Sequence, residues 1–326
     1  MPNIKQIAEA AGVSVTTVSR VLNDHPYVSE AKRQAVEEAI RKLNYSRNMN
    51  AVHLIKGTTR TIGVVLPLIN LYYFARMMEG MAQEALLHNY QLMLCQTDYR
   101  PDEERKVLEM LRNKQIDGLV ICSRSLPLDE VEAYAAYGPI ALCEAVRDRP
   151  LSSVYIDHYA IFQKAITYLW EKGRRRIGFT AGRRRNSPSL HRRLQAYNDT
   201  LLALGGSPRQ EWVLDGCYDI GDGAALVEHL LAMPERPDAL LITGDQVAAG
   251  FILAARSQGL EVPGDFAVIG FDNQPISAVL GITTIDNRLS EIGARAFDSV
   301  RSQLAGQQPG PVSEELGFRF IERGSV

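Results

Sequence analysis

An arginine and several small hydroxyl side chains stand close together near the N-terminus, within residues 15–20. The apolar residues of this stretch, Val18, Val21 and Leu22, recur at helical spacing and predict one buried helix face. The opposite face then carries Val15, Thr16, Thr17 and Arg20. Short side chains with one arginine suit a helix that lies in the major groove of DNA. Any helical hairpin also has an apolar inside and a polar outside, so the pattern alone leaves a plain surface equally open.

The surrounding residues would position this stretch as the second helix of a helix-turn-helix. A first helix upstream has an apolar face formed by Ile4, Ile7, Ala8 and Ala11. Gly12 allows the chain to turn with a positive φ, and Ser14 stands where the N-cap of the second helix belongs. A third helix is expected from Ser29 to about Leu43, and its apolar residues would close a three-helix core. Its exposed basic residues fit either phosphate contacts or an ordinary solvated face.

The ordered run GVSVTTVSRVLN, followed by HPYVSEAKRQAVEEAIRKLNY, resembles the N-terminal headpiece of the lactose-repressor (LacI/GalR) family of bacterial transcription regulators. Residues 1–46 are therefore expected to be a DNA-binding headpiece that acts on palindromic operator DNA as part of a homodimer. The resemblance implies that base edges are read by Val15, Thr16 and Arg20. Thr17 and Asn23 are expected to meet phosphates, and Ser29 is a further DNA-binding candidate.

Residues 47–60 are expected to be a hinge helix and linker. In the family, this segment becomes a short helix only when two subunits sit on the operator, and a leucine from each hinge enters the minor groove and kinks the duplex. Leu54 matches that leucine, and a core position is its alternative role. Arg47 stands where a proline is common, so the start of the hinge helix is less pre-set. The run from Gly57 to Thr59 predicts a flexible linker.

From Thr61 onward, short apolar runs rich in β-branched residues alternate with amphipathic helices in two consecutive series. This alternation predicts an α/β region of two doubly wound subdomains with parallel sheets, after the all-α headpiece. Ligands of such folds bind at the carboxyl ends of the strands, here in a cleft between two lobes.

The resemblance continues to residue 326 and implies a core (residues 61–326) like that of periplasmic sugar-binding proteins. The chain would cross between the lobes near Asp157, Thr284–Asp286 and Phe320. The N-lobe would then hold residues of about 61–157 and 288–319, and the C-lobe residues of about 158–287 and 320–326.

The strand ends supply candidates for binding a ligand in this cleft. Aromatic rings that stack on sugar faces, and polar atoms that meet hydroxyl groups, are what a saccharide site needs. The first strand is followed by Asn70, Tyr72, Tyr73 and Phe74. The resemblance adds Arg193, favoured over the adjacent Arg192, and Asp272, a carboxylate that would accept two hydroxyl groups. Less closely matched strand ends carry Tyr218, Asp245, Glu144 and Asn287. A loop-capping role for Asp272 and core packing for the aromatic residues are the alternatives.

Composition and motifs narrow the class of protein. The net charge is −2, but residues 1–56 carry eight basic and five acidic side chains, so a modestly basic head precedes an acidic body. No dinucleotide, P-loop or nucleophile-elbow motif occurs, and acidic pairs such as Glu103 and Glu104 are expected on helix surfaces. We therefore expect neither an enzyme nor a cofactor. Four dispersed cysteines predict buried free thiols rather than disulfides or a metal site.

Location and assembly follow from what the chain lacks. No apolar stretch reaches the ~20 residues that span a membrane, and the polar N-terminus does not resemble a secretion signal. A cytoplasmic, nucleoid-associated protein without membrane contact is expected. The chain ends without an appended leucine heptad, so we expect a dimer held by apolar faces of the body. One such face is the helix with Met77, Met78 and Met81, although methionines at this spacing are more often core residues.

These observations predict a sugar-responsive repressor of carbohydrate-utilisation genes. Stretches such as GVVLPLINLYYFA look most like regulators of maltose and maltodextrin genes in Gram-positive bacteria. Two other classes stay open. One is a global regulator of the catabolite-control type, which uses a phosphorylated carrier protein as co-repressor. The other is a transport-type sugar-binding protein, against which the headpiece argues.

Overall fold

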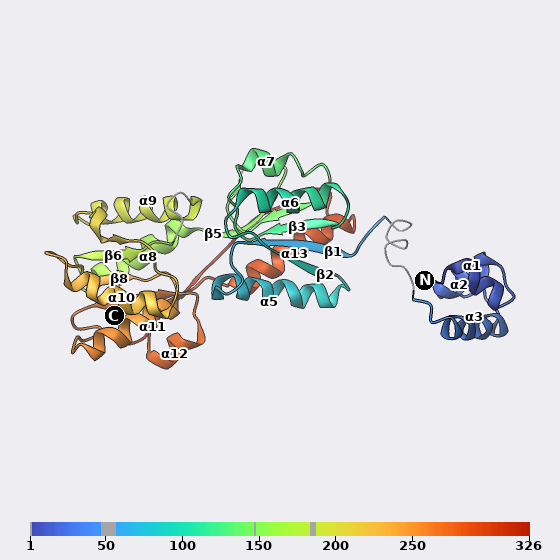
Figure 1. Cartoon of the computed structure of the whole chain (residues 1–326). Coiled ribbons are helices and arrows are strands. Elements are labelled where there is room, and N and C mark those ends of the chain that lie inside the picture. Colours follow the sequence, from blue (N-terminus) through green and yellow to red (C-terminus); the bar gives the residue numbers. More distant parts are fainter. Residues whose placement is uncertain (1, 47–56, 147, 183–186) are drawn as a thin grey trace. The chain divides into compact units, whose positions relative to one another are not determined.

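The computed structural model describes residues 2–46, 57–146, 148–182 and 187–326, and the chain forms two compact units, Met1–Thr58 and Thr59–Val326. The described part of the first unit contains α1 (Ile4–Ala10), α2 (Val15–Leu22) and α3 (Glu30–Lys42), as Figure 1 shows. Asn3 caps α1, and the Ser14 hydroxyl caps α2 by accepting the backbone N–H of Thr17 over 3.2 Å. The helices begin there because these side chains satisfy backbone N–H groups that have no partner within the helix.

The core of the first unit draws one apolar face from each of the three helices. Ile7, Val18 and Val36 are fully buried in it. Gly12 makes the turn between α1 and α2 with a φ of +62°. The predicted helix-turn-helix with a closing third helix is therefore confirmed.

The second unit contains two sheets with helices on their faces (Figure 1). The first sheet has the strand order β11-β5-β4-β3-β1-β2 and the second has the order β12-β10-β9-β8-β6-β7. The strands of the first sheet are β1 (Thr61–Leu66), β2 (Gln91–Gln96), β3 (Gly118–Ile121), β4 (Ile140–Leu142), β5 (Ser152–Ile156) and β11 (Ser313–Leu316). Those of the second are β6 (Ile177–Thr180), β7 (Val213–Leu214), β8 (Ala239–Leu241), β9 (Ala267–Phe271), β10 (Thr283–Asp286) and β12 (Arg319–Ile321).

The helices of the second unit alternate with these strands along the chain. They are α5 (Tyr72–Leu87), α6 (Pro101–Arg112), α7 (Leu128–Glu132), α8 (His158–Glu171), α9 (Pro188–Ala203), α10 (Ile220–Leu231), α11 (Asp245–Ser257), α12 (Pro275–Leu280) and α13 (Leu289–Leu304), with a short 3₁₀ turn at Gln210–Trp212. In the first sheet β1 pairs in parallel with β2 and β3. Within the second sheet, β12 runs antiparallel to β10. The predicted doubly wound parallel sheets are confirmed, with an antiparallel edge strand as an addition.

The two sheets are joined three times by the main chain. The connections run from β5 to α8, from β10 to α13 and from β11 to β12. We call the half built on the first sheet the N-lobe and the half built on the second sheet the C-lobe. The strands nearest the middle of each sheet are continuously buried: β9, for example, is buried along its whole length. Parallel strands covered by helices on both faces have this pattern.

Each lobe packs two helices against each other through glycine. In the N-lobe, α5 and α13 approach so closely that a Cβ atom on Gly80 would lie 1.8 Å from Ser290 O, and one on Gly293 would lie 2.0 Å from Met77 O. In the C-lobe, α10 and α11 use Gly223 and Gly250 in the same way. Backbone contact at these points requires the residue without a Cβ atom.

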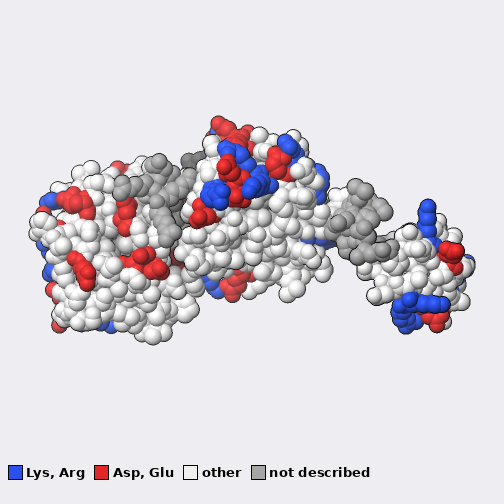
Figure 2. All heavy atoms as spheres, viewed as in Figure 1, with Lys and Arg blue, Asp and Glu red and all other residues white. Residues whose placement is uncertain are grey.

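The surface of the N-lobe combines ion pairs with an apolar edge. Figure 2 shows basic and acidic side chains intermixed over α6 and α7, where Arg105 pairs with Glu130 at 2.6 Å. Leu86 and Leu94, on α5 and on the edge strand β2, are exposed apolar side chains. Met77 and Met81 are fully buried within the single chain, so the methionines belong to the core and do not form the expected apolar surface. No helix among the described residues is both long and apolar enough to cross a membrane.

Candidate effector site and DNA-binding surface

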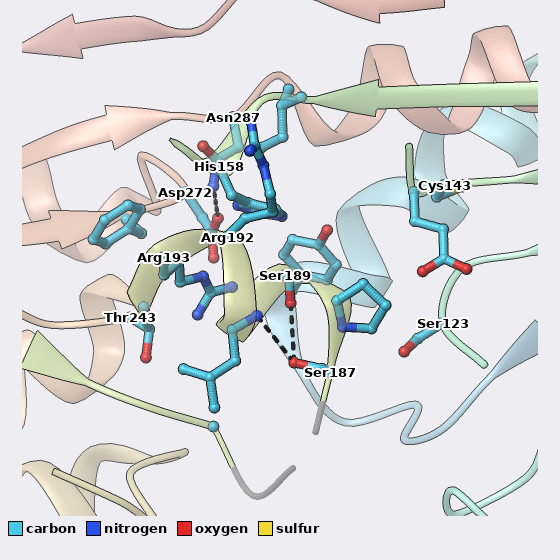
Figure 3. A pocket seen from close by; sticks show the side chains of 18 of the residues that line it. Ser123, Cys143, His158, Ser187, Ser189, Arg192, Arg193, Thr243, Asp272 and Asn287 are labelled. Atoms are coloured by element: carbon cyan, nitrogen blue, oxygen red, sulfur yellow. Dashed lines mark hydrogen bonds between the residues drawn. The ribbon is translucent and has the colours of Figure 1, made fainter. Parts of the chain in front are cut away.

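A cavity of about 830 Å³ lies between the two lobes of the second unit (Figure 3). It sits at the carboxyl ends of strands from both sheets, since Cys122, Cys143, Thr243 and Asp272 each follow a strand. Its N-lobe wall includes Tyr72, Tyr73, Phe74, Ser123, Arg124 and Glu144. Its C-lobe wall includes Ser187, Ser189, Arg192, Arg193, Tyr218 and Gln274. The position agrees with the rule that doubly wound folds bind ligands at strand ends.

Asp272 is held at the C-lobe side of the cavity by an amide. It follows β9 with a φ of +85°, and Asn287 Nδ2 donates to its Oδ1 over 2.8 Å. Burial raises the pKa of Asp272 to about 6, while the Asn287 hydrogen bond and the charge of Arg193 act in the opposite direction. A buried carboxylate can accept hydrogen bonds from hydroxyl groups, so this position suits a polyhydroxyl ligand.

Arg193 enters the cavity from α9. Its guanidinium forms no ion pair or hydrogen bond with another residue that the structure describes, and it lies 5.9 Å from the Phe162 ring centroid. Burial lowers the pKa of Arg193, although the nearby Tyr73 and Asp272 partly compensate. Arg192 also lines the cavity, but it already pairs with Asp157 at 3.1 Å. A buried guanidinium without a carboxylate partner is an available donor for a ligand.

The aromatic residues lie in the first turn of α5. Tyr73 and Phe74 pack edge to face, with ring centroids 5.2 Å apart. Burial raises the pKa of Tyr73, and the neighbouring Asp272 adds to this effect. Tyr72 and Tyr73 thus present rings and hydroxyl groups to the cavity, whereas Phe74 is almost wholly buried in the core around it.

The structure brings most of the expected cleft residues together and leaves two of them out. Asn70 is exposed and does not line the cavity, because α5 begins only after it. Asp245 is fully buried behind the wall, where it accepts a hydrogen bond from Thr284 Oγ1 and another from the Gln274 backbone, both at 2.7 Å. Burial raises the pKa of Asp245 to about 7. Its contacts are those of a residue that braces the loop after β9.

Two side-chain interactions at or behind the N-lobe wall were not predicted. Arg124 pairs with Glu144 across the ends of β3 and β4. Glu104 on α6 is only 3% exposed and accepts the backbone N–H groups of Ser125 and Leu126 at 2.6 and 2.9 Å. The expectation that Glu104 lies on the helix surface was therefore wrong. It shares a helix face with Val107 and Leu111, which is the signal that could have found it.

His158 is a further wall residue that sequence reasoning missed. It is the first residue of α8, next to the crossing from β5. Burial lowers the pKa of His158 to about 3, and the charges of Arg193 and Arg192 lower it as well. The imidazole is therefore neutral at physiological pH and offers both a donor and an acceptor to a ligand.

The predicted DNA-binding side chains among the described residues lie on α2, at its end, and at the start of α3. Val15, Thr16 and Arg20 are exposed on α2. Thr17 is half-buried with its Oγ1 2.9 Å from Ser14 Oγ, and Asn23 donates to Ser19 O over 2.8 Å at the end of α2. Ser29 stands at the N-cap position of α3. The predicted wedge residue Leu54, together with Arg47, lies outside the described residues.

A helix-turn-helix unit joined to a two-lobed binding unit defines a DNA-binding transcriptional regulator that carries its own ligand site. Residues 3–48 match the family described as "Bacterial regulatory proteins, lacI family". Residues 59–315 match "Periplasmic binding proteins and sugar binding domain of LacI family". The chain belongs to the lacI family of bacterial transcriptional regulators.

Individual relatives agree over nearly the whole chain. The HTH-type transcriptional regulator YkvZ of Bacillus subtilis (strain 168) is 42% identical over 327 residues, covering 100% of both chains. Catabolite control protein B of the same organism is 40% identical and covers 91% of this chain and 93% of its own. Among solved structures, a transcriptional regulator CelR–cellobiose complex matches with a TM-score of 0.72 and 26% identity over 100% of both chains. A LacI family regulator from Lactobacillus casei with bound sucrose matches 82% of this chain and 99% of its own, with a TM-score of 0.74 and 26% identity.

Proposed function

We propose that this regulator represses carbohydrate-utilisation genes and that a sugar bound between its lobes changes its affinity for operator DNA. The observation that carries the proposal is the cavity itself, where the guanidinium of Arg193 and the Asp272–Asn287 pair face a space of about 830 Å³. Donors and acceptors placed in this way match the hydroxyl groups of a sugar. Relatives of similar fold with bound cellobiose and sucrose support the same ligand class. Maltose and maltodextrins remain the first sugars to try.

Regulation would follow from different affinities of the sugar for two arrangements of the lobes. A ligand that contacts both walls favours the arrangement in which those walls are close. The same free energy then changes operator affinity, because the coupling between two sites is reciprocal. The role of the cavity is thus binding rather than catalysis, and the protein acts in the cytoplasm, where it associates with the nucleoid.

The DNA-contacting residues belong to the same proposal. Val15, Thr16 and Arg20 read base edges, while Thr17 and Asn23 position the headpiece on phosphates and Ser29 adds a further DNA contact. Leu54 enters the minor groove at the centre of a palindromic operator. A homodimer supplies the two headpieces, and the exposed Leu86, Leu87 and Leu94 are candidates for its apolar interface.

The test is an operator titration at one fixed salt concentration, since affinity for DNA depends strongly on salt. The DNA is a palindrome from the region upstream of the protein's own gene, with maltose, maltodextrins, cellobiose, sucrose or glucose added in turn. We expect one sugar to change the affinity and Arg193→Ala to abolish that response while leaving operator binding without sugar intact. If operator binding is tight and no sugar alters it, the sugar-responsive function is rejected.

A second function is favoured by the 40% identity to catabolite control protein B. In this alternative, a phosphorylated carrier protein acts as co-repressor by docking on the N-lobe. Operator affinity would then rise with the phosphorylated carrier protein and stay unchanged with every sugar. The same titration therefore separates the two functions.

A further inference from the structure

Two cysteine residues occupy neighbouring positions in the N-lobe wall of the cavity. Cys122 follows β3 and Cys143 follows β4, and these strands pair in parallel with Ile121 opposite Leu142. The Cys143 N–H donates to Ile121 O over 2.9 Å, so the ladder extends to the cysteines. Side chains at paired positions of a parallel sheet share a face. Both cysteines accordingly lie in one core cluster with Val120 and Ala141.

The two cysteines lie side by side in the cavity wall. Both cysteines are free and line the cavity, and Figure 3 shows Cys143 in the wall across the pocket from Arg193. The neighbouring Cys122 thiol and burial together raise the pKa of Cys143 well above its usual range. Tyr73 lies near both cysteines, since a negative charge on either thiol raises the pKa of Tyr73 further. Cys143 is therefore protonated at neutral pH, and both cysteines face the space where an effector would bind.

Both thiols are free, and a bridging atom can join them. Neighbouring strands lie ~4.8 Å apart, and an S–S bond is only ~2.05 Å long. A soft atom bound to both sulfurs spans a wider gap, because each metal–sulfur bond is itself ~2.3 Å long. Across the described part of the chain, no group of three or more His, Cys, Asp or Glu residues could hold a metal ion. The candidate ligand is therefore one that two thiols satisfy.

We propose that Cys122 and Cys143 form a two-thiol site that captures a thiophilic ligand of the trivalent arsenical class inside the cavity. With a monosubstituted arsenical oxide, each thiol gives up its proton, two As–S bonds form, and the oxide oxygen leaves as water. Arsenic keeps its oxidation state, so no oxidant or reductant takes part. Once the first As–S bond has formed, the second forms within the same molecule. The protein therefore retains the arsenical ~10²–10⁴-fold more strongly than a single thiol would.

The test uses the full folded chain, phenylarsine oxide as the probe and native mass spectrometry. Excess β-mercaptoethanol removes arsenic held by one cysteine, whereas arsenic held by two resists it and is released by dithiothreitol. We expect one arsenical per chain to survive β-mercaptoethanol, with ~10²-fold weaker retention in Cys122→Ser and in Cys143→Ser. Cys95→Ser and Cys217→Ser are the matched controls and should retain it. A wild-type chain without the resistant adduct, or an adduct that persists in either pair variant, overturns the proposal.

A second measurement needs no variant and so does not depend on folding of the mutants. After treatment with phenylarsine oxide and washing with β-mercaptoethanol, the wild-type chain is unfolded, alkylated with N-ethylmaleimide and digested. Cys122 and Cys143 should escape alkylation, while Cys95 and Cys217 should be modified. Protection of any other pair, or of none, contradicts the assignment.

Discussion

The side-chain amide of Asn287 donates a hydrogen bond to Asp272 Oδ1 over 2.8 Å and so ties the end of β9 to the connection between β10 and α13. That connection is one of the three places where the chain passes between the lobes. The connection between β10 and α13 therefore holds the Asp272 carboxylate in the cavity. Any movement of one lobe against the other must bend this same connection. Asn287 Oδ1 is buried without a hydrogen-bond partner among the described residues, and it remains available to a ligand donor.

Asp272→Asn should stabilise the second unit at pH 7 by roughly 1–3 kcal/mol while it weakens effector binding. Burial raises the pKa of Asp272 from 3.8 to about 6, and each pKa unit corresponds to ~1.4 kcal/mol. The folded state holds the Asp272 proton more tightly than the unfolded state does. The contribution of this group to the free energy of unfolding is therefore fully present below pH ~4 and is lost as pH rises through about 6. The advantage of the variant should therefore be present at pH 7 and absent near pH 4. Urea unfolding of both proteins at both pH values measures this advantage. An equal difference in stability at pH 7 and pH 4 would show that it does not come from the raised pKa of Asp272.

Glu104→Gln should destabilise the N-lobe by roughly 1–3 kcal/mol, the usual cost of leaving buried polar groups unpaired. The carboxylate accepts backbone N–H groups of Ser125 and Leu126, and an amide would turn its own donors toward them. Glu103→Gln is the matched control, since the Glu103 carboxylate pairs with Arg100 and Lys106 at the surface. Its effect should stay within ~0.5 kcal/mol. Denaturant unfolding of both variants measures the difference, and equal losses would refute the bracing role of Glu104.

Gly293→Ala should force α5 and α13 apart and cost roughly 1–3 kcal/mol, as overpacking of a core does. The added Cβ atom would lie 2.0 Å from Met77 O, a backbone atom that cannot move independently of its helix. Gly310→Ala is the control, because a Cβ atom there meets nothing within 4 Å. Thermal unfolding should show a lower Tm for the first variant and no loss for the second. A Gly293→Ala protein as stable as wild type would show that the helices can separate freely.

Asp117→Asn should loosen the point where the chain enters the second unit. The Asp117 carboxylate accepts the Thr59 N–H at 2.8 Å, the Thr59 hydroxyl at 3.0 Å and the Arg60 N–H at 2.8 Å. Losing part of this set should speed hydrogen exchange of the two amides by about tenfold or more, since ~1.4 kcal/mol corresponds to a factor of ten. Exchange of amides within β9 should stay unchanged and serves as the internal control. Unaltered exchange at Thr59 and Arg60 would contradict the anchoring role.

Arg20→Ala should reduce discrimination between operator and random DNA by about 1–3 kcal/mol, the typical value of a base contact. Arg41→Ala changes an exposed residue of α3. It should weaken binding to operator and to random DNA to a similar extent, or not at all. Competition binding at fixed salt measures the ratio of the two affinities. An Arg20→Ala protein that still distinguishes the operator fully would refute base reading by this residue.

Local patterns in the sequence were sufficient to predict the helices and strands and part of the ligand site. Ser14 as a cap and the spacing of Val18 and Val21 predicted α2, because capping and helical periodicity act over a few residues. The buried β-branched runs predicted parallel strands, and strand ends predicted the wall of the cavity. Tyr73 was found in this way and Asp272 through the family resemblance, and both line the cavity.

Only the tertiary structure decided which polar residues face the cavity and which lie behind it. Asp245 and Asp272 both follow strands of the second sheet, yet Asp245 turns inward to Thr284 while Asp272 faces the ligand space. Glu104 is buried because a loop 21 residues later in the sequence places its N–H groups over the helix. Cys122 and Cys143 meet because β3 and β4 are neighbours in the sheet. Such contacts join residues far apart in the chain, and periodicity within one segment carries no information about which segment will lie beside it.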